Sequence, residues 1–178
     1  DFEAYRVLYF GGQKWQEGQA QIAVGDEVIV TGIFTLYNGI SETASGKAWL
    51  YSVNGVKTGD NGLGNLASPF KVAGAKECID AGFGGNVYVQ GVISSIANNG
   101  AFGAQYGNAT FWISDDGTAQ DFEAYRVLYL GNRKWVEGDT QIAVGDKVVL
   151  CGALTKYGDT YETSSGKAWI YSLNGKTE

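Results

Sequence analysis

The chain contains an internal repeat with a period of 120 residues. Residues 1–55 return at 121–175, and the two segments are identical at 35 of 55 positions when aligned without a gap. This period is too long for a solenoid unit and matches the size of one small domain. The chain therefore holds one and a half copies of a domain-sized unit, and the half copy cannot close a core of its own.

The balance of glycine, proline and aromatic residues favours an all-β fold. There are 27 glycines but a single proline, Pro69, which is typical of many short strands joined by glycine turns. The 11 tyrosines, 8 phenylalanines and 5 tryptophans also prefer strands.

One helix and five strands are predicted after residue 62. Ser68 and Pro69 mark a helix start, and apolar residues follow at helical spacing (Val72, Ala75, Cys78, Ile79). Strands are predicted over 86–96, 108–114, 122–130, 147–157 with a bend at Gly152, and 167–173. Strict alternation in the third strand places Phe122, Ala124, Arg126 and Leu128 on one face. Five strands with glycine kinks in about 110 residues fit a small closed barrel, with the helix plugging one end.

The repeat then defines the domains. Residues 67–178 form the complete barrel, and residues 58–66, rich in glycine and asparagine, form a linker. Residues 1–57 repeat only the last three strands and form a half-barrel, which would expose an apolar face and unpaired sheet edges.

Three explanations of the half-barrel stay open. The chain is a window on a longer tandem array, or another polypeptide supplies the missing half, or residues 1–57 add their strands to a neighbouring chain. The absence of methionine indicates a processed chain or a segment of a longer one and favours the first explanation.

A series of motifs follows the order of these elements. They are Ser68-Pro69-Phe70 with its helix, NVYVQGVISSI (86–96), YGNATFWISDDG (106–117), FEAYRVLYL (122–130), QIAVGDKVVLCG (141–152) and SLNG (172–175). This series resembles the OB-fold modules of secreted and surface proteins of Bacteroidetes. The resemblance implies a five-stranded OB-like barrel, here in tandem array, and an extracellular or cell-surface location. No catalytic residues come with that family.

Charge and composition argue against several functions. The net charge is −6 and no segment is basic, so a general nucleic-acid binder is disfavoured. Histidine is absent, which removes the commonest general base and zinc ligand. We therefore expect no enzymatic activity, no metal and no cofactor, and the sequence shows no membrane span.

The two cysteines, Cys78 and Cys151, have two interpretations of equal weight. They form a disulfide, which would imply an oxidising compartment, or they are two inert buried thiols. Asn108 begins an Asn-Ala-Thr glycosylation pattern, although a strand start explains it better. Asp115-Asp116-Gly117 is interpreted as a turn in preference to a calcium loop.

Four tryptophans recur in the repeat. Trp15 and Trp135 share Lys-Trp-x-Glu-Gly, and Trp49 and Trp169 share Gly-Lys-Ala-Trp. Such side chains can stack on sugars or bases, but core or inter-module packing is the favoured interpretation.

The leading functional hypothesis is a structural repeat module of an extracellular bacterial fibre or surface protein. Its partners would be copies of itself or adjacent repeats of the same chain. The alternative is a carbohydrate- or single-stranded nucleic-acid-binding module of a secreted protein.

Overall fold

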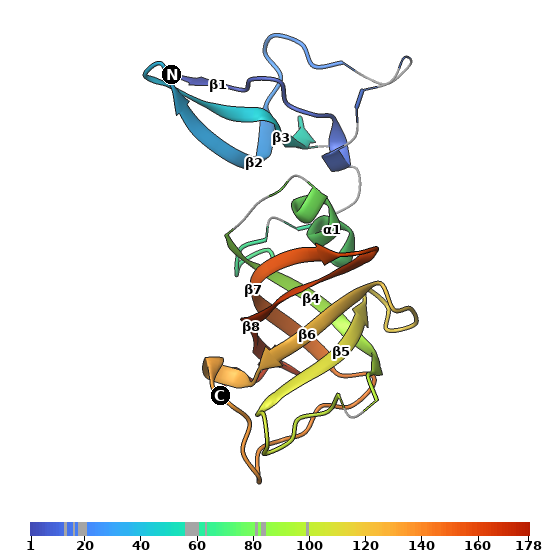
Figure 1. The fold of residues 1–178 in the computed structure, drawn as a ribbon. Helices are drawn as coiled ribbons and strands as arrows, with labels where there is room; N and C mark the ends of the chain where they lie inside the picture. Colours follow the sequence, from blue (N-terminus) through green and yellow to red (C-terminus); the bar gives the residue numbers. More distant parts are fainter. Residues whose placement is uncertain are drawn as a thin grey trace. The chain divides into compact units, whose positions relative to one another are not determined.

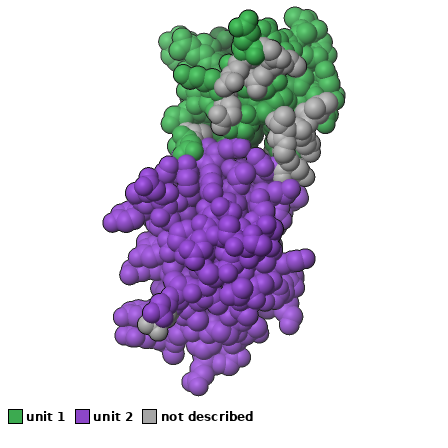
Figure 2. Space-filling view, turned by 90° about the vertical axis from the view of Figure 1, so that its right-hand side faces the viewer, with its two compact units in different colours: residues 1–60, 80–83 green, residues 61–79, 84–178 purple. Residues whose placement is uncertain are grey.

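The computed structural model describes residues 1–12, 14–15, 17, 21–55, 61–62, 64–80, 82, 85–98 and 100–178. The chain divides into two compact units (Figure 2). Unit 1 comprises residues 1–60 and 80–83, and unit 2 comprises residues 61–79 and 84–178. Of the predicted linker, residues 58–60 and 63 lie outside the described residues.

Unit 2 is a closed five-stranded barrel with one α-helix (Figure 1). The elements are α1 (Val72–Asp80), β4 (Asn86–Ile96), β5 (Asn108–Ser114), β6 (Phe122–Leu128), the 3-10 turn η2 (Leu130–Asn132), β7 (Lys147–Tyr157) and β8 (Thr160–Leu173). The order around the barrel is β4-β5-β6-β8-β7, and β7 closes it by pairing with β4. Only β6 and β8 run parallel. The prediction of a mostly β fold with a five-stranded barrel is confirmed.

The barrel interior follows from alternation along the strands. Successive strand residues face opposite sides of the sheet, so every second side chain along a strand points into the barrel, and most of these are apolar. Ten of these are almost completely buried: Val89, Ile93, Ala109, Phe111, Ile113, Phe122, Ala124, Val127, Leu150 and Ile170.

Helix α1 lies at one end of the barrel (Figure 1). Its buried side includes Val72, Ala75 and Cys78. The Val72 amide donates a hydrogen bond of 2.9 Å to Asp115 Oδ1, just after β5. The helix begins at Val72 and not at Ser68, because the Phe70 amide and carbonyl are hydrogen-bonded to Tyr88 and Gln90 of β4. The Asp115 carboxylate then accepts one of the amides that a first helical turn leaves unpaired.

The strict alternation predicted for residues 122–130 is wrong. Arg126 has φ of 50° and its amide donates to Thr110 Oγ1 at 3.1 Å, where the β5–β6 register shifts. One residue in this left-handed conformation makes a bulge and changes which face later residues occupy. Phe122 and Ala124 are buried as expected, but after Arg126 it is Val127 and Tyr129 that are buried.

The strand ends also differ from prediction. Strand β6 stops at Leu128, before the η2 turn, and β8 begins at Thr160 instead of 167. Residues 160–163 pair with the end of β7 across a hairpin. Thr160, Tyr161 and Thr163 are residue types that favour strands, so this extension of β8 agrees with their propensity.

The bend at Gly152 is confirmed. The β7–β8 register shifts between Gly152 and Leu154, and Gly152 has φ of 157°. A Cβ atom there would overlap the Lys167 carbonyl oxygen and the Ala168 backbone. Glycine is thus required here, where the backbone of β8 leaves no room for a Cβ atom on β7.

Unit 1 contains a three-stranded sheet, which confirms that part of the prediction. Its elements are β1 (Phe2–Glu3), the 3-10 turn η1 (Phe10–Gly12), β2 (Val28–Tyr37) and β3 (Ile40–Val53), in the order β1-β3-β2 (Figure 1). These strands occupy the sequence positions of β6, β7 and β8. Their register shifts fall at the same points, after Ile29 and after Gly32, as those after Val149 and Gly152 in the barrel.

The same pair of side-chain hydrogen bonds joins the start of β2 to the end of β3 in unit 1 and the start of β7 to the end of β8 in unit 2. Asn54 Nδ2 donates to Asp26 Oδ1 at 2.7 Å, and Asn54 Oδ1 accepts the Glu27 amide at 2.9 Å. Asn174 bonds to Asp146 and to the Lys147 amide at 2.8 and 2.9 Å. The repeated sequence thus produces the same local structure whether the barrel is complete or not.

In the described part of the chain, no helix combines the length and apolar character needed to cross a membrane.

Candidate interaction surface

Three apolar residues that are identical in the two copies are buried in unit 2 and exposed in unit 1. Phe122 is 0% exposed whereas its counterpart Phe2 is 53% exposed. Ile142 is 4% exposed and Ile22 is 59% exposed. Val148 is 2% exposed and Val28 is 41% exposed. The face of the unit 1 sheet that corresponds to the barrel interior therefore presents large apolar side chains to solvent.

Two sheet edges are open on the same unit. In the barrel, β7 pairs with β4 from Lys147 to Ala153, and β6 pairs with β5 from Phe122 to Leu128. Within the described residues of unit 1, β2 and β1 pair only with β3. Strand β1 is two residues long, whereas its counterpart β6 in the barrel, which pairs with β5, is seven residues long. Unpaired backbone edges of this kind recruit further strands.

In unit 2 the segment formed by α1, β4 and β5 completes the barrel, and it is anchored by Phe102 in the loop between β4 and β5. Its ring contacts Tyr129 edge-on at 5.2 Å and stacks against Trp135 at 6.5 Å. Its amide donates to Gln141 Oε1 at 3.1 Å, and its carbonyl accepts from Gln141 Nε2 at 2.9 Å. Phe102 was not among the residues predicted from the sequence, although it is one of only two aromatic residues, with Tyr106, in the glycine-rich loop 97–107.

The four tryptophans predicted as ligand-binding or inter-module residues differ in unit and in exposure. Trp15 and Trp49 lie in unit 1, and Trp135 and Trp169 lie in unit 2. Trp49 is buried, Trp135 and Trp169 are half-buried, and Trp15 is 42% exposed. The Trp135 indole N–H is buried without a hydrogen-bond partner among the described residues.

Cys78 and Cys151 are both free and buried, so the disulfide alternative is corrected in favour of two thiols. Leu150 is in the core, so its neighbour Cys151 faces the outer side of β7, where its thiol interacts with the Tyr88 hydroxyl. Cys78 lies instead on the buried side of α1. Burial raises the pKa of the Cys78 thiol to about 11 and also raises the pKa of Cys151.

Asn108 is the first residue of β5, pairs with Leu128, and is half-buried. Its glycosylation stays a prediction. In the Asp115-Asp116-Gly117 segment the Asp115 carboxylate accepts the distant Val72 amide, whereas Asp116 accepts local hydrogen bonds. Asp116 Oδ1 accepts from Thr118 and from Ser114, which lowers the pKa of Asp116.

Two carboxyl groups meet where β6 runs beside β8. Glu123 and Glu162 are paired in register. Burial raises the pKa of both, and the charge of Glu162 raises that of Glu123 further. The groups share a hydrogen bond across the strands. We interpret the pair as structural.

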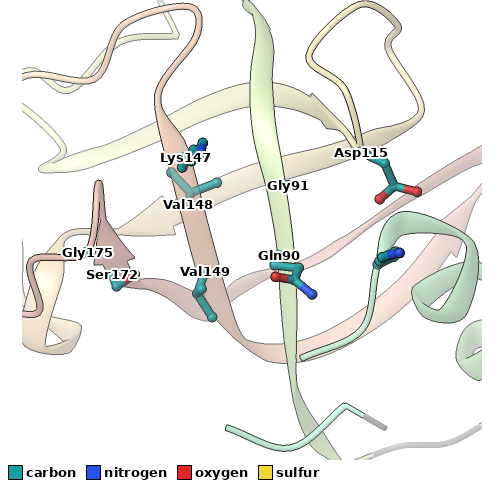
Figure 3. A pocket seen from close by; sticks show the side chains of 9 residues that line it. Gln90, Gly91, Asp115, Lys147, Val148, Val149, Ser172 and Gly175 are labelled. Carbon is teal, nitrogen blue, oxygen red and sulfur yellow. The ribbon is translucent and has the colours of Figure 1, made fainter. Parts of the chain in front are cut away.

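A pocket of about 240 Å³ opens on the barrel wall beside α1 (Figure 3). It is lined by Lys71, Gln90, Gly91, Asp115, Lys147, Val148, Val149, Ser172 and Gly175. Two of its polar side chains already attach the helix segment: Asp115 accepts the Val72 amide, and Gln90 Nε2 donates to the Pro69 carbonyl at 3.2 Å. We therefore interpret the polar side chains of this pocket as attaching the start of α1 to the barrel wall.

Within the described ranges, no three His, Cys, Asp or Glu side chains lie together as a metal-binding group. Comparison with known proteins gave no match to this chain, whether with family models, curated proteins or solved structures. The uncovered sheet of unit 1 is therefore the feature on which a functional argument rests.

Proposed function

We propose that this chain is a structural repeat module of an extracellular bacterial fibre or surface protein, joined end to end with neighbouring modules. The observation that carries the proposal is the uncovered sheet of unit 1. An apolar face with two open edges is an aggregation hazard unless another segment covers it. A chain of modules would cover each such sheet with the next segment along the fibre.

The connectivity of unit 2 supports an OB-type module. The first barrel strand pairs with the second and fourth, and the third runs parallel to the fifth. This arrangement is expected of a five-stranded Greek-key barrel of that type. The acidic net charge of −6 would keep a long array soluble.

Negative-stain electron microscopy of the native material tests the proposal. We expect filaments or elongated chains with a regular axial repeat. Compact, isolated particles would contradict it. The competing hypothesis, a glycan- or single-strand-binding module, predicts saturable quenching of tryptophan fluorescence by an oligosaccharide or oligonucleotide, which the structural role does not.

A further inference from the structure

Unit 1 contains a cavity of about 410 Å³ next to its uncovered face. The residues that line it are Val7, Leu8, Tyr9, Lys14, Trp15, Gln21, Ile22 and Leu50. Shifted by 120 positions, seven of these eight residues are identical, and the eighth changes from Leu50 to Ile170.

The matching positions of unit 2 hold Phe102. Tyr129, Trp135 and Gln141, which contact its ring or backbone, correspond to Tyr9, Trp15 and Gln21 of the cavity. Ile142, which is buried in the barrel, corresponds to Ile22. The cavity of unit 1 is thus lined by the residue types that bind a phenylalanine in unit 2.

We propose that unit 1 is an acceptor site for a polypeptide segment of the same kind as residues 61–120, a helix followed by two strands. This complementing segment would place the counterpart of Phe102 in the unit 1 cavity. The inference rests on the proposed function and names the partner that the uncovered sheet would bind.

The register of the barrel specifies how the strands would pair. In unit 2, Asn86 to Val92 pair with Ala153 to Lys147. The corresponding edge of unit 1 runs from Ile33 to Glu27. Likewise Asn108 to Ile113 pair with Leu128 to Phe122, and the corresponding edge runs from Leu8 to Phe2. Backbone pairing of this kind tolerates the side-chain differences along β2.

Unit 1 also keeps the residues whose backbone groups bond to β4 outside the paired strands. The Gly145 amide donates to the Ile93 carbonyl at 2.8 Å, and the Ile93 amide donates to the Asp146 carbonyl at 2.8 Å. Gly25 and Asp26 stand at the equivalent positions of unit 1. Because β2 and β3 already carry the bulges of β7 and β8, the sheet is preorganised and loses little conformational freedom on binding.

The test adds a separately produced polypeptide of residues 61–120 to the full chain and measures a complex by native mass spectrometry and calorimetry. We expect one segment per chain, and increased hydrogen-exchange protection of residues 27–33. Ile22→Lys, at a position exposed in the free chain, should weaken binding at least ~10-fold because the segment would bury it. Val24→Lys is the matched control, since both Val24 and its counterpart Val144 are exposed. Equal binding to the two variants, or no binding, would overturn the inference.

A second format avoids dependence on the isolated segment. Residues 61–120 are fused directly before Asp1, which recreates the Gln120–Asp121 junction of the chain. We expect Ile22→Ala in this fusion to lower the unfolding midpoint of residues 1–55 as strongly as Ile142→Ala lowers that of the barrel. If Ile22→Ala stays nearly neutral, the inference is wrong. Binding without filaments would refute the fibre alone, and filaments without binding would refute only this acceptor site.

Discussion

The hexapeptide Gln-Ile-Ala-Val-Gly-Asp occurs at 21–26 and again at 141–146, and its isoleucine lies in two different environments. Ile142 is 4% exposed, whereas Ile22 is 59% exposed. Replacement by alanine removes three carbon atoms, each worth about 0.8 kcal/mol when fully buried. Ile142→Ala should therefore lose about 2.4 kcal/mol of transfer free energy, and the cavity left behind brings the total to roughly 3–4 kcal/mol.

Ile22→Ala should cost much less. Because more than half of the side chain is already in water, the transfer contribution falls to about 1 kcal/mol, and solvent fills the space so that no cavity remains. Both variants are made in the full chain. Their local free energies of unfolding are measured by hydrogen-exchange mass spectrometry on peptides from residues 1–55 and 85–178, in dilute solution.

The expected result is a large loss for the barrel in Ile142→Ala and a small loss for unit 1 in Ile22→Ala. Losses of equal size would refute the reasoning, because they would show that Ile22 is covered in the isolated chain in solution.

Three further predictions concern unit 2. Gly152→Ala should destabilise the barrel by at least ~2 kcal/mol in urea unfolding, because a Cβ would overlap the Lys167 carbonyl, whereas Gly103→Ala, with open space around it, should change little. Glu123→Gln should raise the melting temperature slightly at pH 7. Both carboxyls of the Glu123–Glu162 pair have a raised pKa, so their contribution to stability is present at low pH and lost as pH rises through the folded-state pKa, above the usual ~4.3. The variant should therefore show a smaller fall in melting temperature between pH 4 and pH 7 than the parent, and an unchanged fall would contradict the pairing. Finally, reductant should leave the melting temperature unchanged, and a thiol reagent at pH 8 should label Cys78 and Cys151 much more slowly in the folded chain than in urea, because both thiols are buried with raised pKa. Fast labelling without denaturant would argue against that burial.

Much of the fold was predictable because its signals are local. The strands over 86–96, 108–114 and 147–157 match the structure to the residue. The bend at Gly152 was also predictable, since a glycine inside a strand marks a bulge or a close approach. The features that escaped prediction depend on contacts distant in sequence. Arg126 forms a bulge through its bond to Thr110, and Phe102 becomes an anchor only because Gln141 and Trp135 are brought to it by folding.

The sequence by itself determined that residues 1–55 recur at 121–175, and it predicted the barrel strands from their local patterns. Only the tertiary structure decided which residues of each copy are buried. Identical residues such as Ile22 and Ile142 are exposed in one copy and buried in the other. The physical reason is that burial depends on which distant segment packs against a residue, and a local sequence carries no information about whether that segment is present.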